Sequence, residues 1–513
     1  MTRQARRSAP AGRRAKRSRA YRARSVPGAI GLTLVSALIP GLGFVIAGRT
    51  KLGAFVMTMA ASVAGLSVAI AFTRREQVLQ LAVNPDELLL AAGILGFLAI
   101  CWIAVIVSSH RLLRPADGGA AGRAFGSLFV GLICFAIAAP MAVGAQSVIA
   151  QRDLVSSVFA SEGSSKSATR PKMDKKDPWA NIPRLNLLLL GADDGAGREG
   201  TRTDTVIVAS IDTKTGDTAL MTFPRNTVKM PFPESSPLHD VYPNGFWQPG
   251  LDPGSGEAQN WFLDAMYRFV PAEHGDLIGD SDNKGADVLK LSVGEATGLK
   301  LHYYMQVNLK GFEKMVDALG GITVNVNYRV PVGGDDNGTI GYTGDDRLPG
   351  RYIEPGPNKH LLGFDALWFA RGRYNVAGAD HARQVRQRCT IKALVEAADP
   401  RTVVTNYQQI AKAGKNLLRT DIPQELLPAL VELALKVKQG EVTNIDIKDD
   451  LRYGRPDFDG VRETISKALA RGGKPAVQPS TPSTPTMPTS PASPTKKPST
   501  PAGDECAYNP SPE

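Results

Sequence analysis

Cysteine is scarce in this chain, with four residues among 513. So few cysteines cannot form the framework of a disulfide-dense fold, and Cys101 and Cys134 lie inside apolar runs. Cys389 and Cys506 remain as possible partners, and a bond between them requires an oxidising compartment. Catalytic signatures are sparse too. The sequence has no Ser-His-Asp arrangement, no Cys/His metal spacing and no Walker motif, so it does not indicate a serine hydrolase, a zinc site or a P-loop nucleotidase.

Acidic residues are absent from residues 1–24, which contain ten Arg and Lys residues. The whole chain has 60 basic and 49 acidic residues, so the rest of it is close to neutral. A nucleic-acid-binding domain needs basic residues clustered across its own surface. The composition therefore confines the basic character to a tail and argues against nucleic acid as a partner.

Long apolar runs occupy the stretch that follows the tail, near 53–73, 88–108 and 126–148. Each run has about 21 residues without charge, which is enough to cross a hydrocarbon core of about 30 Å. We therefore predict three transmembrane helices in an all-α membrane region at residues 25–150.

The run at 28–48 differs because Pro40 and Gly41 interrupt it. Helix-breaking residues in the middle favour a re-entrant segment over a fourth span. The positive-inside rule places residues 1–24 in the cytoplasm, where the basic tail can bind anionic lipid. Nucleic-acid binding by the tail is the alternative. Three spans place residue 149 onward outside the cell, so we expect a multi-pass protein of the cell membrane with an extracytoplasmic domain.

Short apolar runs rich in β-branched residues begin at 185, after a polar, Ser- and Lys-rich segment at 149–180 that is typical of a stalk. The predicted strands are Leu185–Leu190, Thr205–Ile211, Thr218–Phe223, Tyr303–Leu309 and Ile322–Val326. The predicted helices are 286–297, 310–319, 380–398 and 423–438. Strands mixed with helices indicate an α/β domain with a covered sheet at residues 181–473.

Proline, serine and threonine dominate residues 474–513. Prolines recur at every third position from 479 to 494, which matches the three-residue turn of polyproline II. Such a stretch cannot build a core. We expect an extracytoplasmic tail, either a semi-rigid extension that threads a glycan layer or a disordered segment.

Polar residues follow the first three predicted strands. Asp193 ends the first strand, Arg202 and Asp204 begin the second, and Arg225 follows the third. Arg202 and Asp204 are two residues apart in extended chain, so they are expected to point to the same side. Arginine and aspartate side chains should therefore converge at one edge of the sheet.

A second polar cluster lies near the end of the predicted domain core. It consists of Arg371, Arg373, Asp380, Arg383, Arg386 and Gln387. If Asp380 caps the helix that starts there, it shares one helical face with Arg383 and Gln387. Cys389 then falls on the opposite face and packs inward.

Planar guanidinium groups match phosphate oxygens, and a pair of aspartates can hold Mg²⁺ together with substrate phosphates. The two clusters together predict a pyrophosphate clamp, and ion pairs on a solvated surface are the alternative. His302 and His381 lack metal-ligand spacing, and we expect structural roles for both.

The chain resembles the LytR-CpsA-Psr family of cell-envelope glycopolymer transferases in three ordered blocks, NLLLLGADDG…TRTDTVIVASIDTKTGDTALMTFPRNT, GFEKMVDALGGITVNV and LLGFDALWFARGR…DHARQVRQR. The segment LIPGLGFVIAGRTKLG is similar to actinobacterial forms with a multi-span N-terminus. The resemblance implies an αβα-type sandwich with a mixed sheet, and an apolar groove that holds a polyprenyl chain with its pyrophosphate at the mouth.

The activity implied by the resemblance is transfer of a glycopolymer from a polyprenyl-pyrophosphate carrier to a hydroxyl of peptidoglycan, which leaves a phosphodiester link. A lipid pyrophosphatase and a non-enzymatic membrane regulator acting through the basic tail are the alternatives. The implied phosphotransferase depends on Mg²⁺ or Mn²⁺, and its partners are the lipid-linked glycan donor, the peptidoglycan acceptor and the membrane.

The resemblance also implies roles for individual residues. Phosphate binding falls to Arg202, Arg225, Arg371, Arg373, Arg383 and Gln387. Metal binding falls to Asp193 and Asp204. The catalytic set is Asp204, Arg202, Arg225 and Asp380, with either Asp204 or Asp380 as the group that takes the acceptor proton.

The chain departs from the family pattern at two places. Asn226 stands where the family commonly has an aspartate, so a mechanism that needs a carboxylate there is in doubt. Residues 228–285 are long and rich in Gly, Pro and aromatics, which indicates a lid or a glycan-binding loop outside the core.

Overall fold

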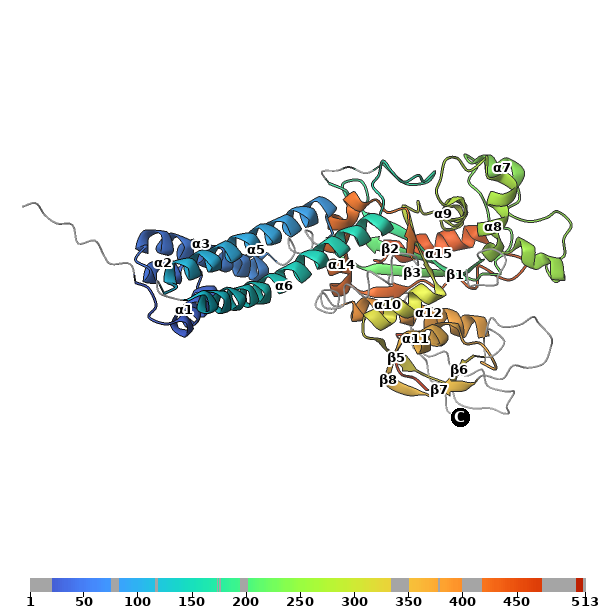
Figure 1. Ribbon diagram of the computed structural model, residues 1–513. Helices are drawn as coiled ribbons and strands as arrows, with labels where there is room; N and C mark the ends of the chain where they lie inside the picture. The colour runs from blue at the N-terminus through green and yellow to red at the C-terminus, as the bar shows by residue number, and fades with distance from the viewer. Residues whose placement is uncertain are drawn as a thin grey trace, which may run out of the picture. The chain divides into compact units, whose positions relative to one another are not determined.

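The computed structural model of the protein describes residues 21–74, 83–115, 119–172, 174, 177–193, 202–333, 350–376, 379–398, 418–472 and 504–510 (Figure 1). The chain divides into two compact units. A helical unit comprises Met1–Val78 and Asp86–Ile149, and an α/β unit comprises Leu79–Pro85 and Ala150–Glu513.

Apolar helices make up the described part of the helical unit. They are α1 (Val26–Leu38), α2 (Leu42–Ile46), α3 (Thr50–Thr73), α5 (Pro85–Leu113) and α6 (Ala120–Val158). Three stretches are long and apolar enough to cross a membrane, namely Thr50–Ile70, Pro85–Leu113 and Ala120–Asp153. Each of these stretches contains or overlaps one of the predicted spans.

The fourth apolar run is broken between α1 and α2. α1 ends at Leu38, and Gly41 has a φ of 99°, a left-handed conformation that favours glycine. A Cβ atom on Gly41 would lie 2.6 Å from the carbonyl oxygen of Gly53 in α3, so this turn packs directly on the next helix. Two short helices therefore replace one span, as the interruption indicated, while the re-entrant placement stays a prediction.

A six-stranded sheet forms the centre of the α/β unit. Its order is β10 (Val442–Asn444), β3 (Thr218–Phe223), β2 (Arg202–Asp212), β1 (Arg184–Asp193), β4 (Tyr303–Asn308) and β9 (Leu418–Thr420). β1 pairs antiparallel with β2 and parallel with β4, so the sheet is mixed. β2 and β3 form the predicted hairpin, in whose turn the Asp212 carboxylate accepts hydrogen bonds from the backbone of Lys214 and Thr215.

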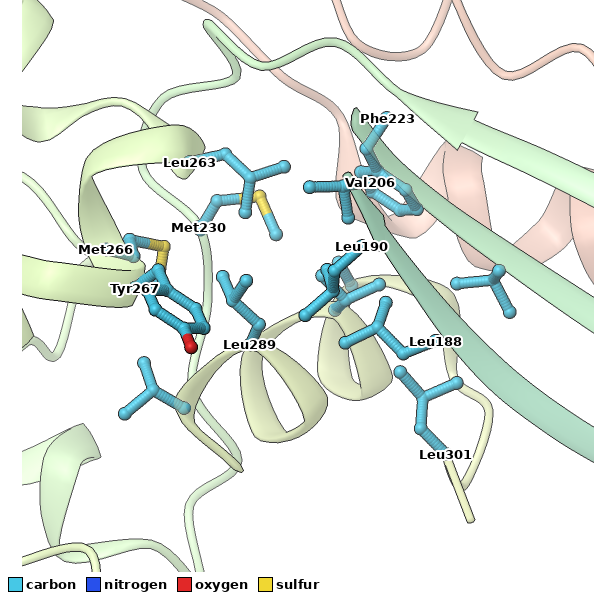
Figure 2. Close-up of a cluster of buried hydrophobic side chains, with 14 of the residues drawn as sticks. Leu188, Leu190, Val206, Phe223, Met230, Leu263, Met266, Tyr267, Leu289 and Leu301 are labelled. Carbon is cyan, nitrogen blue, oxygen red and sulfur yellow. The ribbon is translucent and has the colours of Figure 1, made fainter. Parts of the chain in front are cut away.

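One face of the sheet is covered by α8 (Leu263–His274), α9 (Lys284–Thr297) and α15 (Phe458–Ala470). Figure 2 shows Leu188 and Leu190 of β1 pointing with Val206 of β2 towards Leu289 of α9. Alternate residues of a strand share a face, so these side chains all lie in the core on one side of the sheet.

The opposite face is covered by η2 (Gln424–Leu426) and α14 (Leu427–Gln439), with the end of α6. The residues of β1 that alternate with the first set, Leu185 and Leu187, pack there against Leu427 and Leu433. Helices on both faces of a mixed sheet form an αβα sandwich. The predicted fold class is therefore confirmed.

The aromatic-rich stretch at 228–285 belongs to the main core. Met230, Phe232, Leu238 and Phe246 are all buried against the sheet face that carries α8 and α9. Phe246 contacts Trp261 at a ring-centroid distance of 5.0 Å. The expectation of a lid or loop outside the core is wrong, because these side chains fill volume that the strands and helices leave open.

A smaller lobe packs three helices on two short strand pairs (Figure 1). The helices are α10 (Leu309–Ala318), α11 (Gly363–Arg371) and α12 (Ala379–Ala397). The strand pairs are β5 (Ile322–Val326) with β8 (Gly356–Leu361), and β6 (Val330–Val332) with β7 (Arg351–Ile353). The lobe has its own core, which includes Val326, Trp368 and Phe369.

The segment predicted as a stalk is bonded to the α/β unit. Ser167 and Thr169 donate hydrogen bonds to Asp287, and Ser167 also donates to Asp421 at 3.1 Å. The Asp421 carboxylate pairs with the buried ammonium of Lys290 at 2.7 Å. The hydrogen bonds of these polar residues are therefore made with the domain instead of with water. A solvated stalk would lack such bonds, and the composition of the segment does not reveal them.

The end of the proline-rich tail is fastened to the smaller lobe. Cys506 forms a disulfide bond with Cys389 of α12, and their Cα atoms are 5.4 Å apart. Glu505 pairs with Arg388 at 2.6 Å, and Asn325 of β5 donates a hydrogen bond to the Cys506 carbonyl. Residues 504–510 are therefore docked, whereas residues 474–503 of the predicted tail lie outside the described residues.

We expect Asp421→Ala to lower the free energy of unfolding by about 3 kcal/mol or more, because removal of one partner leaves the Lys290 ammonium buried and unpaired. Thermal or denaturant unfolding of the full chain in detergent measures this loss. The matched control is Glu463→Ala, which breaks a solvent-exposed pair with Lys467 and should change stability little. Equal stability of the two variants would contradict the assigned role of the buried pair.

Candidate functional site

A β-bulge sets the position of Asp204 in the sheet. Gly191 of β1 pairs with Thr205, and the next residue, Ala192, pairs with Thr203. Asp204 is therefore the extra residue of β2, without a partner in the register. A bulge redirects side chains locally, so the regular alternation expected for Arg202 and Asp204 is interrupted at this point.

Arg225 meets Asp204 directly at the end of the β2–β3 hairpin. Its Nη1 atom donates a 2.7 Å hydrogen bond to Asp204 Oδ1, and both side chains are partly buried. Burial by itself would raise the pKa of Asp204, but Arg225, Arg371 and Arg383 outweigh burial and hold the pKa below its ordinary value. The carboxylate is therefore ionised at neutral pH.

Helix α12 reaches the same place from a distant part of the sequence. Gln387 donates a 2.9 Å hydrogen bond from Nε2 to the hydroxyl of Thr205, the neighbour of Asp204. A Cβ atom on Gly191 would lie 2.9 Å from the Cβ of Thr205, so glycine leaves the space in which this threonine sits. Sequence reasoning missed Thr205, and the glycine that ends the apolar run is the signal that points to it.

Three guanidinium groups surround one carboxylate here, and we call Asp204, Arg225, Arg371 and Arg383 the arginine site. Arg371 ends α11 and lies over the ring of Trp368, 5.8 Å from its centroid. Arg383 is buried on α12. The structure thus brings the two predicted polar clusters together, and the phosphate-binding roles of their residues stay predictions.

Other predicted site residues are placed only through their backbone. Asp193 and Arg202 are register partners at the end of the β1–β2 pair, one position beyond the bulge. Their side chains, and that of Asp380, lie outside the described residues. Arg373 follows α11 and is partly buried.

The condition that Asp380 caps its helix is not met, because Ala379 before it is already helical. Asp380 lies inside α12. A carboxylate in the first turn is stabilised by the helix dipole, so it still suits this end of the helix.

Arg386 serves the fold instead of the arginine site. It is buried, and it donates hydrogen bonds to the carbonyls of Phe369 and Gly372. These carbonyls lie at the end of α11, where no further helical turn satisfies them. Arg386 therefore fixes the segment that carries Arg371 and Arg373.

Among the described residues, no group of three or more His, Cys, Asp or Glu side chains could by itself hold a metal ion. Asp204 supplies one ionised carboxylate to the site. This donor set differs from an all-protein metal cage and matches the pattern of Mg²⁺, which takes one or two carboxylates and completes its shell with water and substrate phosphates.

The lowered pKa of Asp204 predicts a defined pH dependence of stability. A carboxyl with a folded-state pKa below its unfolded value contributes stability that is present above the unfolded pKa, about 4, and is lost as the pH falls through the folded pKa. Asp204→Asn should therefore unfold at a lower temperature than wild type at pH 7, and the difference should shrink below about pH 4. Melting curves between pH 7 and pH 3 test this, and a difference that stays constant would contradict it.

Comparison with known proteins identifies several relatives. A polyisoprenyl-teichoic acid–peptidoglycan teichoic acid transferase TagU from Oceanobacillus iheyensis is 29% identical over 249 residues, covering 48% of this chain and 62% of that protein. The TagU of Enterococcus faecalis is 26% identical over 296 residues, covering 56% and 77%. The structure of a LytR-Csp2A-Psr enzyme from Actinomyces oris matches with 15% identity and a TM-score of 0.36, covering 59% of this chain and 96% of that chain.

The match to a whole family is broader than the match to any of these relatives. The profile of the LytR_cpsA_psr family matches residues 154–464. This range is more than half of the chain, and it contains the sheet, the smaller lobe and the arginine site. The chain therefore belongs to the LytR-CpsA-Psr family.

Proposed function

We propose that this protein transfers a glycopolymer from a polyprenyl-pyrophosphate carrier to a hydroxyl group of peptidoglycan. The observation that carries the proposal is the arginine site, where Arg225, Arg371 and Arg383 act on the charge of a single ionised carboxylate. Planar guanidinium groups match the oxygens of a pyrophosphate and can each donate two parallel hydrogen bonds to it.

The chemistry depends on positioning and charge. The acceptor oxygen forms a bond to the glycan-bearing phosphorus, the bond from that phosphorus to the bridging oxygen breaks, and polyprenyl phosphate leaves with the electron pair. Negative charge spreads over the phosphoryl oxygens in the transition state. Fixed guanidinium groups at Arg225 and Arg371 stabilise that charge without reorganisation during the reaction. The apolar groove for the polyprenyl chain, implied by the family resemblance, remains part of the proposal.

A bound Mg²⁺ would neutralise part of the charge on the donor phosphates. Asp204 fits this role because its carboxylate is ionised and lies close enough to Arg225, Arg371 and Arg383 for their charges to lower its pKa. Asp193 ends the neighbouring strand, one register position beyond the bulge, and we propose it as the second ligand.

The acceptor hydroxyl must lose its proton during transfer. Asp204 is held in an ion pair with Arg225, so it is better suited to hold positive charge than to take this proton. Asp380, in the first turn of α12, is the other candidate. We propose Asp380 as the base.

We also propose that the α/β unit lies outside the cell. The Cys389–Cys506 disulfide bond supports this placement, because disulfides persist in oxidising compartments. Three apolar stretches able to span a membrane precede the strands of the sheet in the sequence, and an odd number of spans puts the sheet opposite the basic tail.

Arg225→Ala and Arg371→Ala should each lower the rate of glycan transfer by about 100-fold or more, because each removes a charge that stabilises the transition state. The assay is transfer of labelled glycan from a polyprenyl-pyrophosphate donor to peptidoglycan by the full chain in detergent. Arg329→Ala is the matched control, since Arg329 forms an exposed pair with Glu354. Wild-type rates in both site variants would overturn the proposal, and release of free phosphate without a peptidoglycan product would favour a pyrophosphatase.

Removal of divalent metal should abolish transfer, and Mg²⁺ or Mn²⁺ should restore it. Asp204→Asn should raise the Mg²⁺ concentration needed for half-maximal rate by about tenfold, because a neutral amide is a poorer ligand than a carboxylate. Titration of the chelated protein with Mg²⁺ measures this value. Full activity in excess chelator would contradict the metal requirement while leaving the phosphate-binding role of the arginines intact.

A further inference from the structure

A tight turn carries Arg225 of the arginine site together with the next residue, Asn226. The turn is closed by Thr227, whose backbone amide and hydroxyl donate hydrogen bonds to the Pro224 carbonyl at 3.0 and 2.7 Å. Asn226 stands where the family commonly has an aspartate. The turn therefore offers a neutral amide at a position that commonly carries a negative charge.

Helix α8 is joined to this turn through its first backbone amides. The Leu263 amide donates to the Thr227 carbonyl at 2.9 Å, and the Asp264 amide donates to the Arg225 carbonyl at 3.1 Å. The two carbonyls satisfy amides that a helix start leaves open, since the N-cap residue, Phe262, makes no capping bond with its side chain. The Leu263 side chain lies in the main core (Figure 2), so α8 is fixed and holds the turn in place.

Asp264 brings a carboxylate to the contact between α8 and the turn. Only 3% of this residue is exposed. Among the described residues, Asp287 and Asp421 are the other acidic residues that are buried to this degree. Their hydrogen bonds hold the segment at 167–169 and the ammonium of Lys290, whereas Asp264 lies beside the arginine site.

The surroundings of Asp264 favour a negative charge. The residue stands in the first turn of α8, where the positive end of the helix dipole stabilises a carboxylate. Its backbone bond to Arg225 implies α-carbons about 5–6 Å apart, the spacing of hydrogen-bonded strands. Charges at short range interact strongly where water is excluded. Both features offset the cost of burying a carboxylate.

Arg268 is an alternative partner for Asp264, because residues four apart on a helix are neighbours. Its side chain is exposed, and water weakens exposed ion pairs. Arg225 is partly buried and already bonded to Asp204 at 2.7 Å. A second carboxylate nearby limits the orientations that are open to the guanidinium group of Arg225.

We propose that Asp264 is a positioning residue for Arg225, and that it supplies from α8 the negative charge that Asn226 does not supply from the turn. The inference rests on the proposed function, in which Arg225 stabilises the charge of the transition state. A guanidinium group that neighbouring carboxylates hold in one orientation needs no reorganisation during the reaction. The charge can come from either of two segments in contact, the turn or the start of α8.

Exchange of the two side chains tests this proposal. Asp264→Asn keeps the shape of the side chain and should lower kcat for glycan transfer by about tenfold or more, because a misplaced guanidinium stabilises the transition state less well. The double variant Asn226→Asp/Asp264→Asn returns the charge to the turn and should recover most of the wild-type rate. The assay is transfer of labelled glycan to peptidoglycan by the full chain in detergent.

Two further variants are matched controls. Asp459→Asn removes a carboxylate from the first turn of another helix, α15, where 92% of the side chain is exposed. It should keep the wild-type rate. Arg268→Ala removes the alternative partner of Asp264 and should also keep that rate.

Thermal unfolding of the same proteins gives a readout without catalysis. Asn226→Asp should lower the melting temperature of the wild-type chain, because it places two carboxylates at one contact and like charges disfavour each other. The same change should lower the melting temperature much less when Asp264→Asn is already present. A double-mutant cycle measures this departure from additivity.

The outcomes separate this inference from the proposed function. A wild-type rate in Asp264→Asn, a loss that the exchange does not recover, or additive melting temperatures would each overturn the positioning role. An equal loss in Arg268→Ala would assign the effect to a pair within α8. If Asp264→Asn and the exchange variant both fail to fold, Asp264 serves the fold and the inference fails. If the melting temperatures are non-additive but wild-type protein forms no peptidoglycan product, the transferase proposal fails and the coupling of the two positions stands.

Discussion

The arginine site depends on the attraction between the Asp204 carboxylate and the guanidinium groups around it. Asp204 stands outside the strand register because of the bulge opposite Gly191 and Ala192, and this position brings it to Arg225. Arg225 and, from a distant part of the chain, Arg371 and Arg383 all lower the pKa of this carboxylate. We propose that this arrangement binds a pyrophosphate, because planar guanidinium groups match phosphate oxygens.

Helix α12 is held in place by contacts of three of its residues. Gln387 attaches the helix to Thr205 beside the sheet, Arg386 holds the carbonyls at the end of α11, and Cys389 binds the C-terminal segment. Arg386 and Cys389 are three residues apart and share one face of the helix, and Gln387 lies on another. Arg383 projects from a helix that is fixed against rotation, and a fixed guanidinium loses little entropy when it binds a phosphate.

The strands and the main helices could be predicted from the sequence because apolar runs of the right length carry local information. β3 spans the predicted Thr218–Phe223 without change. The docking of residues 504–510 and the core position of Phe246 could not be predicted, since both depend on partners far along the chain. For the site, Arg386 is an example of a residue whose role could not be predicted from the sequence. Arg386 follows Arg383 by three residues on the same helix, so the sequence does not distinguish their roles. Only the structure reveals that Arg386 donates hydrogen bonds to backbone carbonyls.

The bond between Cys389 and Cys506 closes a covalent ring of chain, with a sequence separation of 117 residues. The ring contains the C-terminal part of α12 together with β9, η2, α14, β10 and α15. A single proteolytic cut anywhere within it leaves one covalent molecule, because the two fragments stay linked through sulfur. They would part on a denaturing gel only after a reducing agent is added, so a nicked protein can pass as intact under oxidising conditions.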